Sequence, residues 1–206
     1  MINLETLEEI DDLHSIWPHE ALDFMPRLAK KENIARLSDA IGIDITVEDT
    51  ESAVGDFSLD ILASETGTSK KIVIENQLEK TNHDHLGKLI TYAAGNSANY
   101  IIWVVKQARN EHKAAIEWLN NHTDEGIEFF LIEIKLYKIG KFNTALKLEL
   151  VEQPNGWTKE LKKQVERLPK INKLYMISRL IFMMMPLKMK NLQKTLEKET
   201  ILIVLT

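Results

Sequence analysis

Two acidic side chains lie on apolar segments that the sequence predicts to be neighbouring strands. Residues 57–62 alternate apolar and polar side chains and include Asp60, and residues 72–77 lead an apolar run into Glu75. Residues 65–69 have the small and polar composition of a hairpin turn, so the two strands are expected to pair and to bring both carboxylates together. Mg²⁺ prefers hard oxygen ligands, commonly one or two carboxylates with water and phosphate. The pair therefore predicts a magnesium site, at which Mn²⁺ can substitute.

The residues that follow Glu75 extend this chemistry. The carbonyl of Asn76 offers a further oxygen ligand for the metal. Gln77 lies on the same face of the strand as Glu75, where it can orient an attacking water. Hydrolysis of a phosphodiester needs a cation, an activated water and a group that orients this water, and all three are accounted for here.

A second interpretation treats the two acids as solvated residues on an exposed sheet face. The residues before Glu75 argue against it, because Ile72, Val73 and Ile74 form a stretch that looks buried. A buried acid needs a partner, which favours a functional site. Asp56 precedes Asp60 on the same face and is interpreted as an acid at the strand entry.

Together these features resemble the PD-(D/E)XK nuclease superfamily, which has a restriction-endonuclease-like fold. The resemblance covers residues 32–106 by motif and element order, and residues 54–87 also resemble a prokaryotic branch of that superfamily. It implies that Asp60 and Glu75 are the two motif acids. The lysine usual in the second motif is Gln77 here, a glutamate-x-glutamine variant. Lys88 occupies a helix position where many relatives carry glutamine, and we hypothesise that it restores the missing cation.

Weaker candidates surround this core. Residues 83–96 are predicted to form a helix whose stripe carries His85, Lys88 and Tyr92. His83 and His85 are expected to cap the helix or contact phosphate, and Tyr92 is either a core aromatic or a substrate contact. The first helix often contributes one more acid in this fold. The sequence leaves three candidates for it, namely Glu20, Glu32 and Asp39.

The predicted architecture is a mixed α/β sheet flanked by helices, in the order α-β-β-β-α-β-α-β-β. It occupies residues 1–155 as one domain, followed by a basic helical segment over residues 156–206. The net charge of −5 combines about −12 in the first part with +7 in the second. Residues 175–189 contain five methionines, and an apolar tail ends the chain. We expect this end to be truncated or out of frame relative to its relatives.

Composition narrows the class of protein. The 206 residues include no cysteine, which excludes disulfides and fits a cytoplasmic location. No signal peptide or membrane-spanning segment is predicted. The preferred function is Mg²⁺-dependent hydrolysis of nucleic acid, more specifically DNA, by an endonuclease or exonuclease, with a homodimer suggested by the need to cut two strands. The alternative is a catalytically inactive nuclease-fold protein that binds nucleic acid or acts as an assembly module.

Overall fold

The computed structural model describes residues 6–55, 57–140 and 143–156. The chain divides into two units, Met1–Asn155 and Gly156–Thr206. Of the second unit only Gly156 is described, so the predicted basic helical segment and its predicted truncation lie outside the described residues. In the described part of the chain, no helix has the length and apolar character needed to span a membrane.

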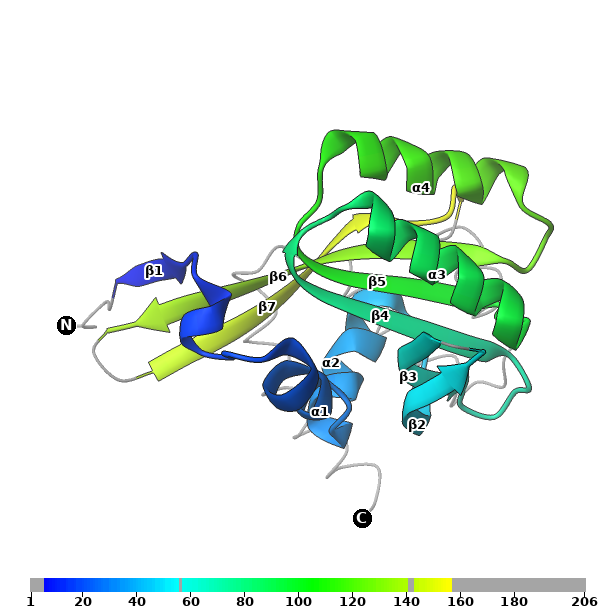
Figure 1. Cartoon of the computed structure of the whole chain (residues 1–206). Helices are drawn as coiled ribbons and strands as arrows, with labels where there is room; N and C mark the ends of the chain where they lie inside the picture. The colour runs from blue at the N-terminus through cyan, green and yellow to red at the C-terminus, as the bar shows by residue number, and fades with distance from the viewer. Residues whose placement is uncertain (1–5, 56, 141–142, 157–206) are drawn as a thin grey trace, which may run out of the picture. The chain divides into compact units, whose positions relative to one another are not determined.

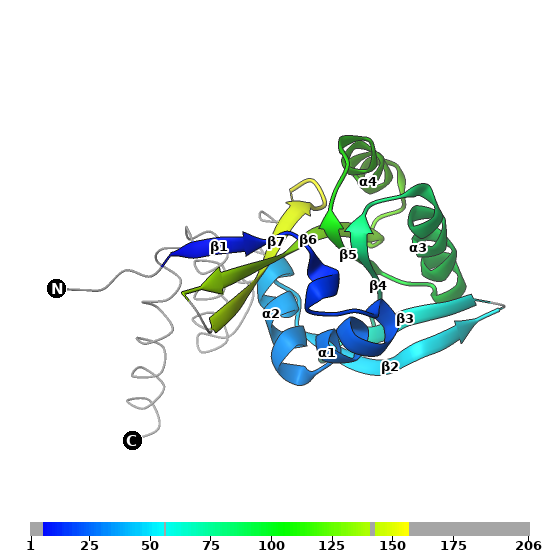
Figure 2. The same cartoon turned by 60° about the vertical axis from the view of Figure 1, so that its left-hand side comes forward.

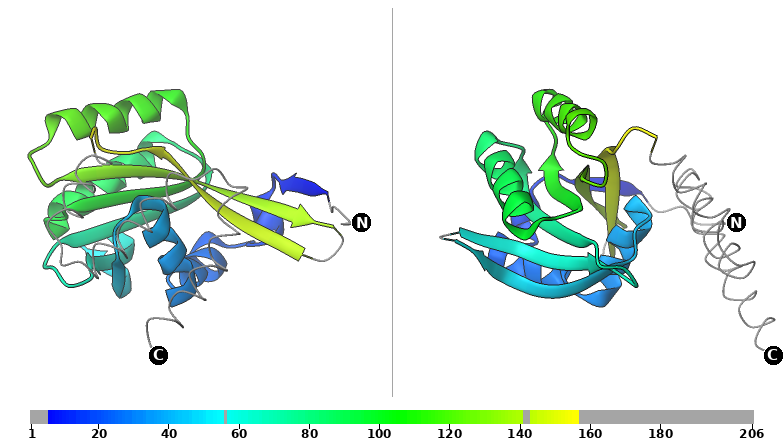
Figure 3. Two further views of the ribbon diagram at one scale, coloured as in Figure 1. Left: turned by 180° about the vertical axis from the view of Figure 1, so that it is seen from behind. Right: turned by 90° about the vertical axis from the view of Figure 1, so that its right-hand side faces the viewer.

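Seven strands form one mixed sheet in the first unit (Figure 1). Their bounds are β1 (Leu7–Ile10), β2 (Ile45–Val54), β3 (Phe57–Glu65), β4 (Lys71–Lys80), β5 (Tyr100–Gln107), β6 (Glu128–Ile139) and β7 (Asn143–Glu152). The order across the sheet is β1-β6-β5-β4-β3-β2, and β7 also pairs with β6. β4, β5 and β6 run parallel, and the other pairs are antiparallel. Figure 3 shows how strongly this sheet curls from β6 to β2.

Helices cover both faces of the sheet. The helical segments are η1 (Leu13–Ser15), η2 (Glu20–Phe24), α1 (Met25–Leu28), α2 (Lys31–Ile41), α3 (His83–Asn96) and α4 (Asn110–His122). α3 and α4 lie on one side of the parallel strands, whereas α1 and α2 lie on the other (Figure 1). The predicted class, an α/β fold with a mixed sheet flanked by helices, is thereby confirmed.

The central strand β5 explains where the core lies. Every residue from Tyr100 to Val105 is buried, as expected of a parallel strand with helices over both faces. On the α3 side, Trp103 and Val105 join a cluster with Leu89 and Tyr92 of α3. The continuous apolar run in the sequence therefore predicted this strand correctly.

α2 begins and ends where the sequence indicates. Its buried stripe contains Ile34, Leu37 and Ile41, spaced as one face of a helix. Gly42 follows with φ 80°, a left-handed conformation in which its N–H bonds the carbonyl of Ser38. This helix packs against β2 and β7.

The structure adds a strand that the predicted order lacks. The first twelve residues suggest a short acidic helix or a frayed end, but Leu7–Ile10 form β1, antiparallel to the last four residues of β6. β6 is longer than β5, so its far half continues past the parallel core together with β7 (Figure 2). β1 pairs there because this part of β6 extends beyond β5 and has a free edge. The pairing depends on residues far away in the chain, so the sequence of residues 7–10 alone does not predict a strand.

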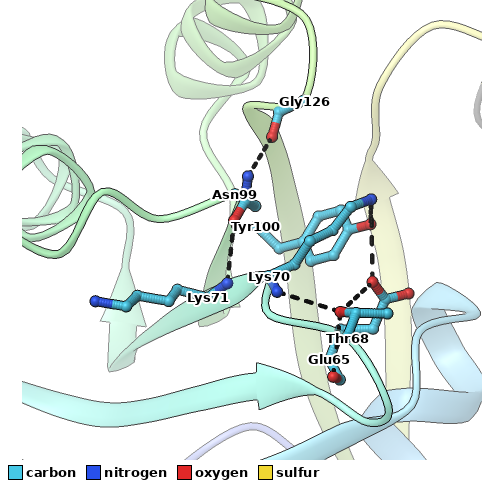
Figure 4. A network of polar contacts seen from close by, with 7 residues as sticks. All are labelled: Glu65, Thr68, Lys70, Lys71, Asn99, Tyr100 and Gly126. Atoms are coloured by element: carbon cyan, nitrogen blue, oxygen red, sulfur yellow. Dashed lines mark hydrogen bonds and ion pairs between the residues drawn. The ribbon is translucent and has the colours of Figure 1, made fainter.

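Asn99 fixes the starting points of the three parallel strands. Its side-chain Oδ1 accepts from the N–H of Lys71 at 3.1 Å, and its Nδ2 donates to the carbonyl of Gly126 at 3.3 Å (Figure 4). Its own N–H donates to the carbonyl of Lys71, and its carbonyl accepts from the N–H of Glu128. One residue therefore links β4, β5 and β6 at their amino ends, which also aligns their carboxyl ends.

Near Asn99, a group of polar side chains connects the turn between β3 and β4 with the first residue of β5. Lys70 donates to the hydroxyl of the buried Tyr100 and lies 3.9 Å from the carboxylate of Glu65 (Figure 4). Thr68 donates to that carboxylate at 3.0 Å and accepts from the N–H of Lys70. The hairpin turn between β3 and β4 is thus joined to the start of β5.

We predict that Asn99→Ala lowers the free energy of unfolding by about 2 kcal/mol, because two hydrogen bonds worth about 1 kcal/mol each are lost. Asn99→Asp keeps the acceptor for Lys71 and should lose about half as much. Asn110→Ala, at an exposed position, is the control. Chemical denaturation measures the effect, and an Asn99→Ala protein as stable as the control would contradict the role given to Asn99.

Candidate active site

The ladder between β3 and β4 ends before β4 does. The two strands pair from Ser64↔Lys71 to Ile61↔Ile74, whereas β4 continues to Lys80. On its other edge, β4 remains paired with β5 through Gln77. The edge of β4 that faces β3 therefore carries backbone groups without a strand partner from Asn76 onward, and buried backbone groups require other partners.

Two carboxylates supply these partners. Asp60 Oδ2 accepts from the N–H of Asn76 at 2.8 Å, and Glu20 accepts from the N–H of Leu78. The N–H groups of alternate residues point to the same edge of a strand, so both acids lie along one side of β4. Glu20 comes from η2, and His14 of η1 makes a second contact with this end of β4, 3.0 Å from Glu79.

Glu75 is buried on β4, directly before Asn76. Its side chain is 2% exposed, and its Oε2 has no hydrogen-bond partner among the described residues. Burial, and then the charge of Asp60, raise the pKa of Glu75 to about 9. An ionised Glu75 therefore requires a cation beside it.

The pKa of Asp60 is raised as well. Burial raises its pKa to about 6, and the charge of Glu20 acts in the same direction. The hydrogen bond from the N–H of Asn76 opposes this shift because it stabilises the carboxylate. Two neighbouring acids whose pKa values are both raised by burial thus share one end of the β3–β4 pair.

Lys88 is a positive charge that acts on the pKa values of the acids. It lies on α3 with an exposed side chain, and its charge lowers the pKa of Glu20, Asp60 and Glu75 alike. Tyr92, one turn further along α3, is 1% exposed. Burial raises the pKa of Tyr92, followed by the charges of Glu75 and Asp60, so its hydroxyl also belongs to this cluster.

Gln77 is buried on the face of β4 that also carries Glu75. Its Nε2 donates to the carbonyl of Lys80 at 2.8 Å, and its buried Oε1 has no partner among the described residues. The fixed amide therefore presents an oxygen that can accept from a water. In Asn76, the carbonyl points to the same edge as the N–H bound by Asp60, because both groups of a strand residue point the same way.

Of the three candidates for an extra acid, the structure brings one to the site. Glu20 binds β4 and shifts the pKa of both Asp60 and Glu75. Glu32 is exposed in the first turn of α2, and Asp39 is half-buried further along that helix. Neither is among the charges that most affect the pKa of Asp60 or Glu75.

The two predicted histidines have different surroundings. His85 is half-buried, and both its N–H and its Nδ1 contact the Oδ1 of Asn82, the residue that caps α3. Burial lowers the pKa of His85, and Lys88 adds to this shift. His83 is exposed, and its Nδ1 lies 3.2 Å from Nε2 of His112 in α4. His112 was not predicted from the sequence, where it is one polar residue within an amphipathic helix.

The residues present fit a magnesium ion. Among the described residues, no group of three or more His, Cys, Asp or Glu side chains is arranged to hold a metal. Magnesium needs fewer protein ligands, since one or two carboxylates suffice when water and phosphate complete the shell. Asp60, Glu75 and the carbonyl of Asn76 supply oxygens of the right kind, and the unpartnered Oε2 of Glu75 is the atom that most requires a cation.

No protein-family model and no curated protein matches this chain. Two solved structures do. A repair endonuclease from Pyrococcus abyssi is 16% identical with a TM-score of 0.38, over 50% of this chain and 47% of its own. The EndoMS–dsDNA2 complex is 18% identical with a TM-score of 0.36, over 51% and 45%. The chain thus covers less than half of each protein, and its function has to be inferred from the residues of the site itself.

We predict that, without divalent metal, Glu75→Gln becomes increasingly more stable than the wild type as the pH rises from about 5 to about 9. The unfolded chain releases the Glu75 proton near the ordinary pKa of 4.5, whereas the folded chain keeps it to about 9. The wild type therefore loses stability across this window, and glutamine, which does not ionise, avoids the loss.

Melting temperatures in EDTA measure this difference. Glu32→Gln, at an exposed position, is the control and should follow the wild type. Parallel curves for the wild type and Glu75→Gln from pH 5 to 9 would show that Glu75 is ionised in the folded protein.

Proposed function

We propose that this chain is a Mg²⁺-dependent nuclease of restriction-endonuclease-like fold that hydrolyses phosphodiester bonds in DNA. The observation that carries the proposal is the buried pair Asp60 and Glu75 at the open end of the β3–β4 ladder, with Lys88 facing both. A pair of this kind is unfavourable by itself and becomes favourable around a cation. Perturbed acids of this sort occur preferentially at functional sites.

The metal would be held by the carboxylates of Asp60 and Glu75 and by the carbonyl of Asn76. When bound there, Mg²⁺ offsets the charge of the phosphate and makes water more acidic. Asp60 keeps its hydrogen bond from the N–H of Asn76 through its Oδ2, which fixes the carboxylate while its other oxygen remains for the metal. Glu20 adds negative charge beside them and keeps the end of β4 in place.

The remaining groups act on water and phosphate. Gln77 accepts a hydrogen bond from the attacking water at Oε1, because its Nε2 is already bound to Lys80. The ammonium group of Lys88 stabilises the negative charge that develops on the phosphate oxygens. Cutting both strands of a duplex takes two such sites, so we propose a homodimer, acting in the cytoplasm.

A second candidate function follows from Gln77. A carboxamide lacks the positive charge of lysine, and its nitrogen is engaged by a backbone carbonyl. The second candidate is therefore a protein that binds nucleic acid through this surface without cutting it.

The deciding experiment is a cleavage assay on linear, circular and single-stranded DNA with Mg²⁺, Mn²⁺ or EDTA. We expect metal-dependent cleavage by the wild type, none by Asp60→Ala or Glu75→Ala, and a loss of about a hundredfold for Lys88→Ala. Equal cleavage by Lys88→Ala and the wild type would exclude the role given to Lys88. DNA binding without cleavage in any metal would support the second candidate.

We also predict that Glu20→Gln reduces cleavage by about tenfold, as expected when a group beside the metal ligands is changed. The amide oxygen of glutamine can still accept from the N–H of Leu78, so this variant removes the charge while keeping the cap of β4. Glu32→Gln and Asp39→Asn are the matched controls and should cleave like the wild type. If either control loses activity and Glu20→Gln does not, the extra acid comes from α2.

A further inference from the structure

Three polar side chains join the start of α3 to the start of α4. The hydroxyl of Thr81 accepts from the N–H of Arg109 at 2.9 Å and lies 2.8 Å from Nδ1 of His112. Nε2 of His112 lies 3.2 Å from Nδ1 of His83, the first residue of α3. We refer to Thr81, His112 and His83 as the corner cluster. It spans the loops that follow the parallel strands β4 and β5, where both helices begin (Figure 1).

The corner cluster is buried at its centre. Thr81 is fully buried, His112 is 3% exposed, and the ring of Trp103 packs edge-on against His112 at 5.7 Å between centroids. Burial lowers the pKa of His112, with His83 and Arg109 acting in the same direction and Glu111 opposing them. A neutral imidazole has one donor and one acceptor nitrogen, so its two contacts form a directional chain. An apolar side chain in place of His112 would fill the same space but would form no hydrogen bonds to Thr81 and His83.

The corner cluster is adjacent in sequence to groups of the candidate site on both sides. Thr81 follows Lys80, whose carbonyl holds the amide of Gln77. The N–H of Thr81 donates to the carbonyl of Gln107, just beyond the irregular pairing of β4 with β5. On the other side, His83 begins the helix that carries Lys88. A displacement of this corner therefore moves Gln77 and Lys88 relative to each other.

We propose that Thr81 and His112 are positioning residues that set the start of α3, and thereby hold Lys88 over Asp60 and Glu75. The side-chain hydrogen bonds of the corner cluster join its own members and the N–H of Arg109, so its action on the acids passes through the helix. This inference rests on the proposed nuclease function, because Lys88 needs this position only if it acts on a substrate held at the acids.

Thr81→Val and Thr81→Ser test the proposal as a matched pair. Valine keeps the shape and removes the hydroxyl, whereas serine keeps the hydroxyl. With both variants shown to be folded by circular dichroism, we expect Thr81→Val to lower kcat by about tenfold, as small misplacements do. KM should stay within about twofold, since the loss falls on the chemical step. Thr81→Ser should restore kcat, and equal rates for the two variants would overturn the proposal.

Combining the change with Lys88→Ala distinguishes positioning from general destabilisation. If the corner cluster acts through Lys88, Thr81→Val should have little further effect in a Lys88→Ala background, and the two losses will not add. Additive losses would overturn the proposal. His83→Ala repeats the test at an exposed position, where the outer contact is removed without opening the core.

Failure of the nuclease function itself gives a different result. If the wild type cleaves no DNA, amide hydrogen exchange in the first turn of α3, at His85 and Leu86, decides whether the corner cluster positions this helix. Faster exchange in Thr81→Val than in Thr81→Ser would support positioning, and equal exchange would overturn it.

Discussion

The structure of the site depends on one requirement of the backbone. β4 runs beyond its antiparallel partner, and its N–H groups at Asn76 and Leu78 must be bonded inside the protein. Asp60 and Glu20 meet this requirement with carboxylates where a strand would have used carbonyls. The acids are therefore partly buried for a structural reason, and this burial raises the pKa of both Asp60 and Glu20. The chemistry of the site follows from the way the sheet ends.

The two ends of the parallel strands have complementary roles. At the amino ends, Asn99 directly precedes β5 and hydrogen-bonds to the starts of β4 and β6, which sets the alignment of the three strands. The second half of β4 carries Glu75 and Gln77, and the helices that follow β4 and β5 lie over one face of the sheet. Well-satisfied polar contacts at one end stabilise the sheet, while the opposite end keeps an unpartnered oxygen on Glu75. Such a division is common in proteins, because functional groups are seldom arranged for greatest stability.

The sequence predicted the elements whose signals are local. Alternation on β3 and the turn after it were sufficient to pair the strands that carry Asp60 and Glu75, and the pattern of residues 83–96 predicted the helix that carries Lys88. Features that depend on distant contacts were not accessible. Glu20 is 58 residues from its partner Leu78 and lies in a short helix without a marked apolar face, so nothing local distinguished it from Glu32 or Asp39. The same holds for β1, which forms by pairing with the distant β6. It also holds for the contact of His112 with Thr81, which lies 31 residues away in the chain.

The carboxylates at the end of β4 also affect how this strand edge can interact with other chains. An unpaired strand edge inside a sheet is a template onto which another chain can add, and proteins protect such edges with charge or with irregular backbone. Here the N–H groups of Asn76 and Leu78 donate to Asp60 and Glu20, and the negative charge of these acids opposes the approach of a further carbonyl. The carboxylates that we propose as metal ligands or neighbours of the metal thus also protect the sheet from aggregation by strand addition.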